Sequence, residues 1–355
     1  YQYFTADFEP DSYDAVREAF IGPYRTETNP LGVENGRLSG SRQKGGNQCA
    51  ALHKAFVLEE GATQRLCFML GEGRREQGQS VREKYADPAA RDNAIAALAA
   101  YWDEKCRAMQ IDTPNPGMNT MINIWTLYQA EINVKFSRFA SFIELGGRTG
   151  LGYRDTAQDS MTVQNSNPGR CRQRILQLLN GLTSSGYGLH LFQPEWFEPE
   201  AEQQSFKSPT LIPTPDAASI IHGLDDACSD DALWLVPSIV EFIKETGDLA
   251  FADYPVAYAD AGSDTVYGHM KTILDFSGRM TGVHGICLGL RADWNDCLNL
   301  GGGESAMVSF LHVWALDSFI SLARRLGRSE DVEFYQHMRD TVAEVCETIL
   351  WDDAW

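Results

Sequence analysis

The segment LRADWNDCLNLGGGES, residues 290–305, combines side chains that could carry out acid catalysis on a sugar. Asp293 and Asp296 lie on either side of Trp294, and a tryptophan face packs well on a pyranose ring. A carboxyl group beside that ring can protonate a glycosidic oxygen as the bond breaks. The same residue types also form ordinary loops, because Asn, Asp and Gly favour turns and Ser305 could cap a following helix. Taken alone, the segment supports both interpretations.

A second segment, SRFASFIELGGRTGLGYRDTAQD at residues 137–159, gathers arginines and glycines in an otherwise acidic chain. Its candidate residues are Arg138, Arg148, Arg154, Asp155 and Asp159. An arginine fork matches phosphate oxygens or paired sugar hydroxyls, and glycine lets the backbone approach a ligand closely. The alternatives are a surface loop with ordinary ion pairs and a nucleotide-binding loop. The nucleotide-binding loop is disfavoured, because the pattern GxxxxGK[ST] is absent.

A third segment, HGLDDACSDDALWL at residues 222–235, crowds four acids before an apolar run. It lacks the alternating oxygen ligands, central Gly and terminal Glu of a calcium loop. Capping of the next helix by Ser229 or Asp230, with Asp231 in the first turn, is the favoured role. The segment could also border a sugar site. The histidines at 190, 222, 269, 284 and 312 fit no HExxH or triad signature and are expected to be structural.

The elements that must position these residues change along the chain from β to α. Short aromatic or alternating runs at 1–8, 49–61 and 65–73, separated by Gly, Asn and Pro, predict strands. Apolar residues at helical spacing within 87–111 then predict a linker helix.

Beyond Thr113 the apolar spacing of three and four residues predicts a series of helices. They are expected within 118–132, 169–182, 230–248, 266–278, 305–327 and 329–351. The last two are separated by Gly327-Arg328, and Ser329 is a candidate cap. Apolar helices joined by alternately short and long connections suit two concentric layers, an (α/α) barrel. The alternative is an ordinary helical bundle.

Composition limits the class of protein. With 355 residues, 43% of them hydrophobic, the chain is globular and long enough for one large domain or two ordinary ones. The formal net charge of -19 repels nucleic acid and anionic lipid, so neither is an expected partner. Eight cysteines without metal-ligand spacing predict reduced thiols in the cytoplasm and no metal site.

Neither a secretory leader nor an apolar run that approaches a membrane span is evident in the sequence. The chain opens mid-pattern at YQYFTADFEP without Met and stops at ILWDDAW. We therefore expect it to be part of a longer protein.

RADWNDCLN and GGRTGLGYRDTAQD together resemble the inverting β-glycoside phosphorylases, a family that includes enzymes acting on cellobiose, chitobiose and cellobionic acid. The resemblance covers essentially the whole chain. Four further segments, YGLHLFQPEWFEPE, KSPTLIPTP, IHGLDDACSDDALWL and NLGGGESAMVSFLH, are most similar to the members that act on chitobiose.

This resemblance implies a mainly α fold. Residues 1–73 would be the C-terminal part of an N-terminal β-sandwich domain, 74–112 a helical linker, and 113–355 the first part of an (α/α)6-barrel catalytic domain. It also implies a cytoplasmic homodimer that uses phosphate as co-substrate and has neither a metal nor an organic cofactor.

The chemistry of the family can be argued from charge. A phosphorylase replaces the water and base of an inverting hydrolase with phosphate, so one carboxyl acid and a cationic cradle suffice. By resemblance Asp296 is the general acid, and we expect it to be buried beside Trp294 so that it stays protonated. Arg148, Asp155 and Trp294 match residues that hold the non-reducing sugar. Arg138 matches an arginine that holds phosphate.

Four nearby residues are expected to support these loops rather than to contact substrate. They are Asp293, Asn295, Arg154 and Asp159.

The reaction expected on this basis is phosphorolysis of N,N'-diacetylchitobiose to α-N-acetylglucosamine 1-phosphate and N-acetylglucosamine. Cellobionic acid or cellobiose is the alternative substrate. An inverting glycoside hydrolase, or a sugar-binding protein without catalysis, is the alternative class.

Overall fold

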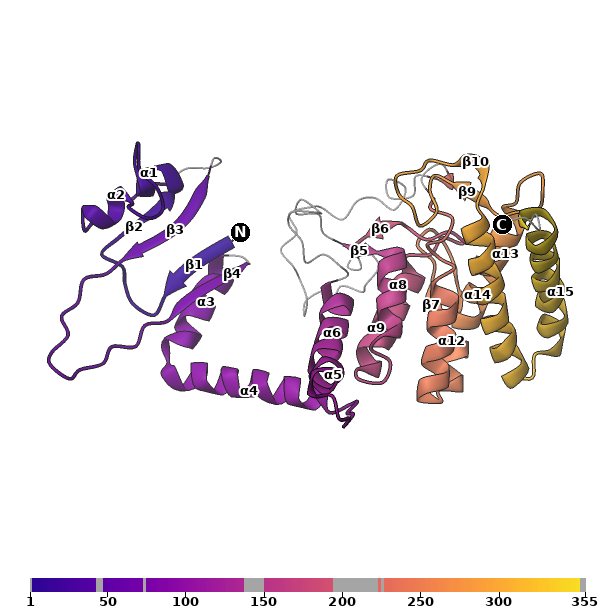
Figure 1. Cartoon of the computed structure of the whole chain (residues 1–355), viewed down its shortest axis with the longest axis horizontal. Coiled ribbons are helices and arrows are strands. Elements are labelled where there is room, and N and C mark those ends of the chain that lie inside the picture. Colours follow the sequence, from indigo (N-terminus) through magenta and orange to yellow (C-terminus); the bar gives the residue numbers. More distant parts are fainter. Residues whose placement is uncertain are drawn as a thin grey trace. The chain divides into compact units, whose positions relative to one another are not determined.

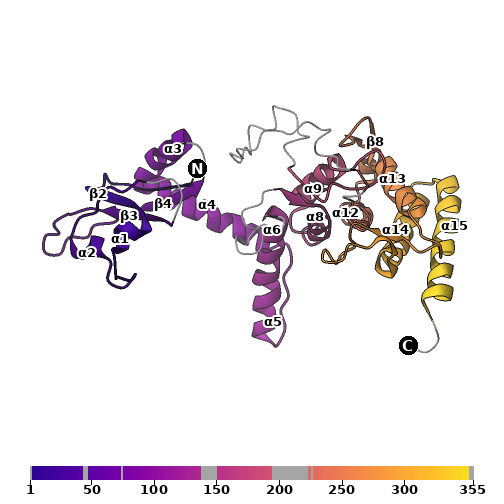
Figure 2. The same cartoon turned by 90° about the horizontal axis from the view of Figure 1, so that it is seen from above.

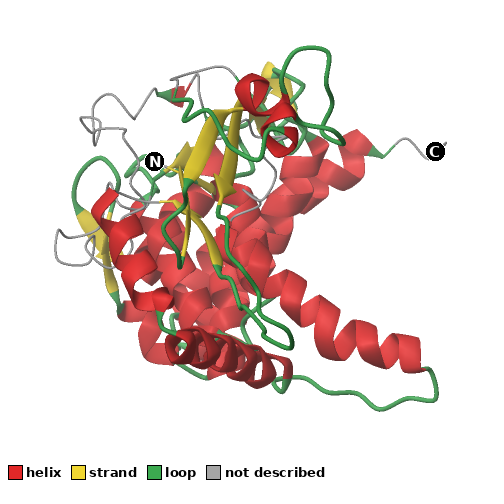
Figure 3. Cartoon of the chain, turned by 90° about the vertical axis from the view of Figure 1, so that its left-hand side faces the viewer, coloured by secondary structure: helices red, strands yellow, loops and turns green. Residues whose placement is uncertain are grey.

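The computed structural model describes residues 2–42, 47–72, 75–136, 150–193, 223–224 and 227–351. Helices predominate among these residues (Figure 3), as the sequence predicted. The chain divides into two units, Tyr1–Ala100 and Tyr101–Trp355. Arg138, Arg148 and His222 lie outside the described residues, so their expected roles stay predictions.

The first unit contains four strands in two antiparallel pairs. They are β1 (Gln2–Ala6), β2 (Ser12–Val16), β3 (Gln48–His53) and β4 (Phe68–Glu72). β1 pairs with β4, and β2 pairs with β3. Strands were predicted where β1, β3 and β4 lie. β2 was not predicted, because its buried position is occupied by the acid Asp14, which interrupts the alternation of apolar and polar residues. Asp14 is tolerated there because it accepts from the Ser39 and Ser41 hydroxyls.

Four helices follow or separate these strands, and the last of them extends past the division between the two units. The helices are α1 (Arg17–Ile21), α2 (Leu31–Glu34), α3 (Arg75–Ala86) and α4 (Pro88–Cys106). The predicted linker helix is present as α4, and the division between the two units falls within it.

The second unit is an array of helices with short strand pairs between them. The helices are α5 (Pro116–Thr120), η1 (Met121–Thr126), α6 (Leu127–Phe136), α8 (Tyr153–Met161), α9 (Pro168–Asn180), α12 (Leu235–Thr246), η4 (Leu249–Asp253), α13 (Val266–Arg279), α14 (Ala306–Arg325), α15 (Ser329–Val345) and η5 (Cys346–Leu350). The strand pairs are β5 (Leu151–Gly152) with β6 (Leu191–Phe192), β7 (Pro255–Ala257) with β8 (Ser263–Thr265), and β9 (Leu288–Leu290) with β10 (Gly301–Glu304). Every helix predicted beyond Thr113 is present.

The helices of this unit stand side by side (Figure 1) and alternate between two rows along the chain. Seen from above in Figure 2, α8, α12 and α14 form one row, and α9 and α13 lie beside it. Helix α12 packs against α8, α9, α13 and α14. This alternation is the arrangement expected for two layers of an (α/α) barrel, rather than for a simple bundle.

Side-chain caps explain where several helices begin. Ser305 accepts from the Val308 amide at the start of α14, as predicted, and Asn167 accepts from the Arg170 amide at the start of α9. Two predicted caps are wrong. Arg328, not Ser329, precedes α15, and the cap of α12 is Trp234 rather than Ser229 or Asp230. Asp230 instead accepts from the Trp234 indole N–H at 3.0 Å.

The core of the second unit is formed by apolar faces of α8, α9, α12, α13 and α14. The expectation that no apolar run approaches a membrane span needs correction. Ala306–Arg325 is long and apolar enough to cross a membrane by length and composition. However, 61% of its most apolar window is buried in the protein, and Phe319 and Leu316 are fully buried in the core. These properties are typical of a core helix.

His312 of α14 is a fully buried histidine, which agrees with the structural role expected for it. Burial lowers the pKa of His312 from 6.5 to about 4, so the ring is neutral in the folded chain near neutral pH. Its Nδ1 lies 3.8 Å from the Cys287 sulfur.

We predict that His312 makes folding sensitive to acid. Because its pKa is about 4 when folded and 6.5 otherwise, stability is fully present above pH 6.5 and falls as the pH drops towards 4. The loss amounts to roughly 3 kcal/mol. When the free energy of unfolding in urea is measured across this range, His312→Leu should reduce its fall at low pH, called here the acid limb. The exposed His337 of α15 provides the control, because His337→Leu should leave the limb unchanged. An identical acid limb in His312→Leu would contradict the prediction.

Candidate active site

Arg154 is the centre of a buried cluster of charges in the second unit. It lies in the first turn of α8, and only 4% of its surface is exposed. The guanidinium Nε donates to Asp231 at 2.9 Å, and Nη2 lies 3.3 Å from Asp230. On its other side, Nη2 lies 3.1 Å from the Asp296 carboxylate. One buried cation therefore connects α8 to two loops that are distant in sequence.

The two acids that face Arg154 are themselves fully buried. Burial and the neighbouring charge of Asp231 raise the pKa of Asp230, whereas Arg154 acts to lower it. Burial alone would lower the pKa of Arg154, but the carboxylates of Asp231, Asp230 and Asp296 together raise it. Arg154 therefore supplies positive charge to Asp230, while Asp231 is in contact with both Arg154 and His190.

The loop that carries the predicted acid runs between β9 and β10. Asp293 holds it in three ways: its carbonyl accepts from Arg154 at 2.8 Å, and its carboxylate accepts from the Asn295 amide and the Ser305 hydroxyl, each at 2.8 Å. Asn295 in turn accepts from the Cys297 amide at 3.1 Å. These bonds agree with the predicted supporting roles of Asp293, Asn295 and Arg154.

Asp296 is not buried beside Trp294, and this expectation was wrong. Its side chain is 65% exposed, and Trp294 is 53% exposed. The physical reason is local, because Asp293 and Asn295 accept from the amides of Asn295 and Cys297 and so form consecutive turns, in which residues 294–297 are exposed. The acid is therefore presented at the surface of the described structure, with Arg154 beneath it.

Asp155 and Asp159 lie on the same helix as Arg154 but in different surroundings. Asp155 is half-buried in the first turn of α8, and its carboxylate rests against Gly152. Asp159, one turn farther along, is 3% exposed and faces the protein interior. The burial of Asp159 suits the supporting role predicted for it.

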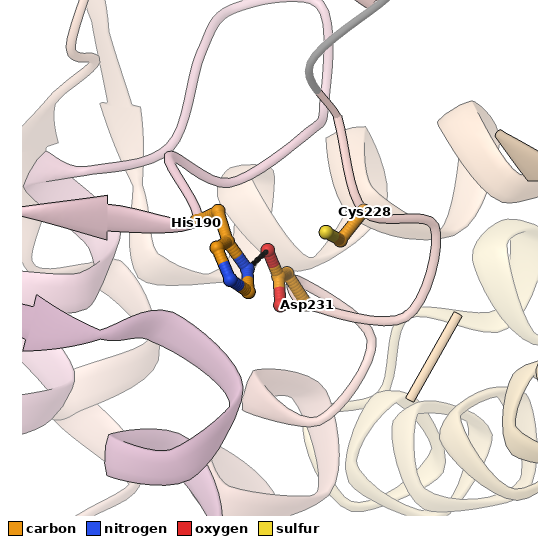
Figure 4. A group of neighbouring side chains, drawn as sticks. All are labelled: His190, Cys228 and Asp231. Carbon is orange, nitrogen blue, oxygen red and sulfur yellow. Dashed lines mark hydrogen bonds and ion pairs between the residues drawn. The ribbon is translucent and has the colours of Figure 1, made fainter. Parts of the chain in front are cut away.

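His190 and Cys228 extend the cluster on the far side of Asp231. His190, immediately before β6, faces the Asp231 carboxylate with an Nδ1 to Oδ2 distance of 3.0 Å (Figure 4). Cys228 is buried, and its sulfur points towards the same carboxylate. The hydrogen bonds with Asp231 and Cys228 raise the pKa of His190.

Sequence reasoning did not find the buried roles of Asp230 and Asp231, and it treated His190 as merely structural. A signal was available in the sequence. Two consecutive acids directly before the apolar run ALWLVPSIV must enter the core, and a buried carboxylate requires a cation or hydrogen-bond donors. The partner, Arg154, lies 77 residues away, which spacing alone could not indicate.

Two family models match the chain, one for each part. The glycosyl hydrolase 94 supersandwich domain matches residues 1–88, and the catalytic domain of the glycosyl hydrolase 94 superfamily matches residues 101–355. The mainly α fold after an N-terminal sandwich was predicted from the sequence, and these matches confirm it.

Curated relatives are similar over nearly the full chain. The N,N'-diacetylchitobiose phosphorylases of Vibrio furnissii and Vibrio proteolyticus are each 56% identical over 354 residues, or 99% of this chain and 44% of theirs. The 3-O-beta-D-glucopyranosyl-beta-D-glucuronide phosphorylase of Paenibacillus borealis is 26% identical over 99% of this chain and 43% of its own length. The chain therefore spans less than half the length of these relatives. It belongs to the glycosyl hydrolase 94 family and comprises supersandwich and catalytic-domain sequence.

Proposed function

We propose that the protein catalyses phosphorolysis of N,N'-diacetylchitobiose, with inversion, to α-N-acetylglucosamine 1-phosphate and N-acetylglucosamine. The observation that carries the proposal is the 56% identity, over 99% of the chain, to two phosphorylases with that substrate in their names. The enzyme would be a glycosyltransferase of the disaccharide phosphorylase type. Cytoplasmic location, a homodimer and the absence of a metal or organic cofactor are parts of the same proposal.

Asp296 would act as the general acid that protonates the oxygen of the leaving sugar. Its exposed position lets a sugar reach it, and Trp294 two residues earlier offers an aromatic face for the ring. As Asp296 gives up its proton it acquires negative charge, and Arg154 at 3.1 Å would stabilise that charge.

Phosphate would replace water as the nucleophile, so a second carboxylate base is unnecessary. Arg138 would hold phosphate, while Arg148 and Asp155 would hold the non-reducing sugar. Of these three, Asp155 lies within the described residues, one position from Arg154 in the first turn of α8. A fixed arginine beside the incoming anion offsets the charge that gathers as the new bond forms.

A second candidate keeps the mechanism and changes the sugar. Cellobionic acid is an alternative because a cellobionic acid phosphorylase of Neurospora crassa is 22% identical over 99% of the chain. Cellobiose is the other alternative, which rests on the sequence resemblance alone. The much greater similarity to the chitobiose enzymes makes N,N'-diacetylchitobiose the first choice.

The test uses the protein expressed at the full length of its gene. Each of the three disaccharides is incubated with and without phosphate, and the sugar 1-phosphate and its anomer are measured. We expect α-sugar 1-phosphate from N,N'-diacetylchitobiose only when phosphate is present. Cleavage that is independent of phosphate would indicate a hydrolase, and no cleavage of any disaccharide would leave sugar binding as the function.

A further inference from the structure

Three kinds of metal ligand, from His190, Cys228 and Asp231, come together beside the acid loop, the segment 291–300 that carries Asp296 between β9 and β10. Each contributes one donor atom, and the three donors lie within 4.8 Å of one another. They come from separate segments, with Cys228 and Asp231 spaced as C-x-x-D before α12 and His190 just before β6 (Figure 4). The sequence predicted neither the cluster nor any metal site.

We propose that these three residues form a binding site for a divalent cation of the zinc type, whose occupancy inhibits the enzyme. Thiolate, imidazole and carboxylate together are a ligand set that zinc prefers to calcium or magnesium.

The His190 and Asp231 donors are spaced nearly as in a tetrahedral zinc site, and the Cys228 sulfur lies within 4.8 Å of both. Ideal zinc bonds place a nitrogen and an oxygen about 3.3 Å apart, and a sulfur about 3.6 Å from either. The distance from His190 Nδ1 to Asp231 Oδ2 is 3.0 Å. If the two atoms moved apart by a few tenths of an ångström, the ion could bind between them. The ion would take the place of the proton that these two atoms share.

Burial and charge also suit a cation. Asp231 is fully buried and Cys228 is 3% exposed, whereas the His190 side chain is 32% exposed, which leaves a route from solvent and a fourth position for water. A thiolate and a carboxylate would neutralise the two charges of the ion. The other oxygen of Asp231 already accepts from Arg154, and such an outer hydrogen bond orients a carboxylate that binds a metal.

Occupancy of the site would affect the acid loop by two routes, and this half of the proposal rests on the proposed function. Asp231 anchors Arg154, which also contacts Asp296. Cys228 forms backbone bridges with Leu290 and Ala292, directly before the loop, and the next amide, of Ser229, donates to Ala292 at 2.9 Å. A cation that draws Asp231 and Cys228 inward would therefore shift both supports of the acid.

Binding is tested with cobalt(II) as a spectroscopic probe for zinc. Titration of reduced, metal-free protein at mildly alkaline pH should give a sulfur-to-cobalt charge-transfer band that saturates at one equivalent and is displaced by zinc. Cys228→Ser should abolish the band. Loss of a residue that only hydrogen-bonds to a metal ligand weakens metal binding about 10- to 100-fold. His190→Gln removes a ligand itself, so it should weaken cobalt binding by at least this factor.

The matched control is Cys297→Ser, because Cys297 is an exposed cysteine within the acid loop and outside the three proposed ligands. It should keep the band. Parent-like circular dichroism and melting would establish that each variant is folded. The absence of a band in the parent, a band that survives in Cys228→Ser, or one that is lost in Cys297→Ser would overturn the site.

Inhibition is measured in the synthetic direction, from sugar 1-phosphate and N-acetylglucosamine, to avoid precipitating zinc phosphate. Zinc should inhibit the full-length protein, a chelator should restore activity, and Cys228→Ser should need at least about tenfold more zinc for the same inhibition. Activity of the metal-free parent tests the proposed function separately. Full activity at zinc concentrations that displace cobalt would refute the inhibitory role.

Discussion

Asp296→Asn is expected to lower phosphorolysis of N,N'-diacetylchitobiose by about 10²- to 10⁴-fold, the contribution of a positioned general acid. Asparagine keeps the size of the side chain but cannot deliver the proton that the leaving sugar requires. The measurement is kcat with saturating phosphate and disaccharide in the full-length protein. The fold should persist, because the Asp296 side chain is 65% exposed and adds nothing to the core.

A substrate that needs no protonation distinguishes a lost acid from a damaged site. Fluoride departs without a proton, so the corresponding β-glycosyl fluoride should react with Asp296→Asn almost as fast as with the parent. If the variant lost both reactions equally, Asp296 would be needed for binding or shape instead of acid catalysis.

Asp253→Asn is the matched control for this substitution. Asp253 is also 65% exposed and also pairs with an arginine, Arg328 at 2.6 Å, but it lies in η4, outside the cluster around Arg154. Its substitution should leave kcat within about twofold of the parent, since surface ion pairs contribute little. A large loss in Asp253→Asn would mean that removing any such surface carboxylate affects activity non-specifically.

Arg154→Met is expected to lower the free energy of unfolding by about 3 to 5 kcal/mol, the cost of breaking a buried ion pair from one side. Methionine retains much of the volume but removes the cation that faces the fully buried Asp230, and it leaves the fully buried Asp231 to pair with His190. Urea unfolding at neutral pH measures the change. Adding Asp230→Asn should recover part of the loss, because it removes the buried carboxylate that Arg154 had faced, whereas Asp231 keeps His190 at 3.0 Å.

Arg339→Met provides the comparison for a surface pair. Arg339 contacts Asp317 at 3.0 Å, but the Asp317 side chain is 51% exposed, so its loss should cost at most about 1 kcal/mol. Equal effects of Arg339→Met and Arg154→Met would show that the buried carboxylates do not depend on Arg154.

The parts of the fold that follow from local pattern could be predicted from the sequence. Helices α9, α13, α14 and α15 carry regular apolar spacing, and their sides face one continuous core. Helix α8 could not be predicted in this way, because polar residues such as Arg154, Thr156 and Asp159 lie on its buried side. There the tertiary partners, not the hydrophobic period, decide what is buried.

Part of the candidate site could also be predicted from the sequence. Asp293, Trp294 and Asp296 could be found because they are adjacent in the chain and their types suggest sugar chemistry. The burial assigned to Asp296 was wrong, because exposure depends on how the turns at Asp293 and Asn295 direct the loop. The support from Asp230 and Asp231 depends on pairing across the fold, which one sequence does not reveal.

The long sequence separations within the Arg154 cluster have a consequence for how the protein folds. The bonds of Arg154 to Asp231 and to Asp293 join residues 77 and 139 positions apart. Contacts of such high sequence separation close large loops and form slowly compared with helices. The cluster should therefore assemble late, after most helices exist. During synthesis on the ribosome, Arg154 emerges before Asp231 and Asp293, so the cluster cannot form until both of these residues have been synthesised.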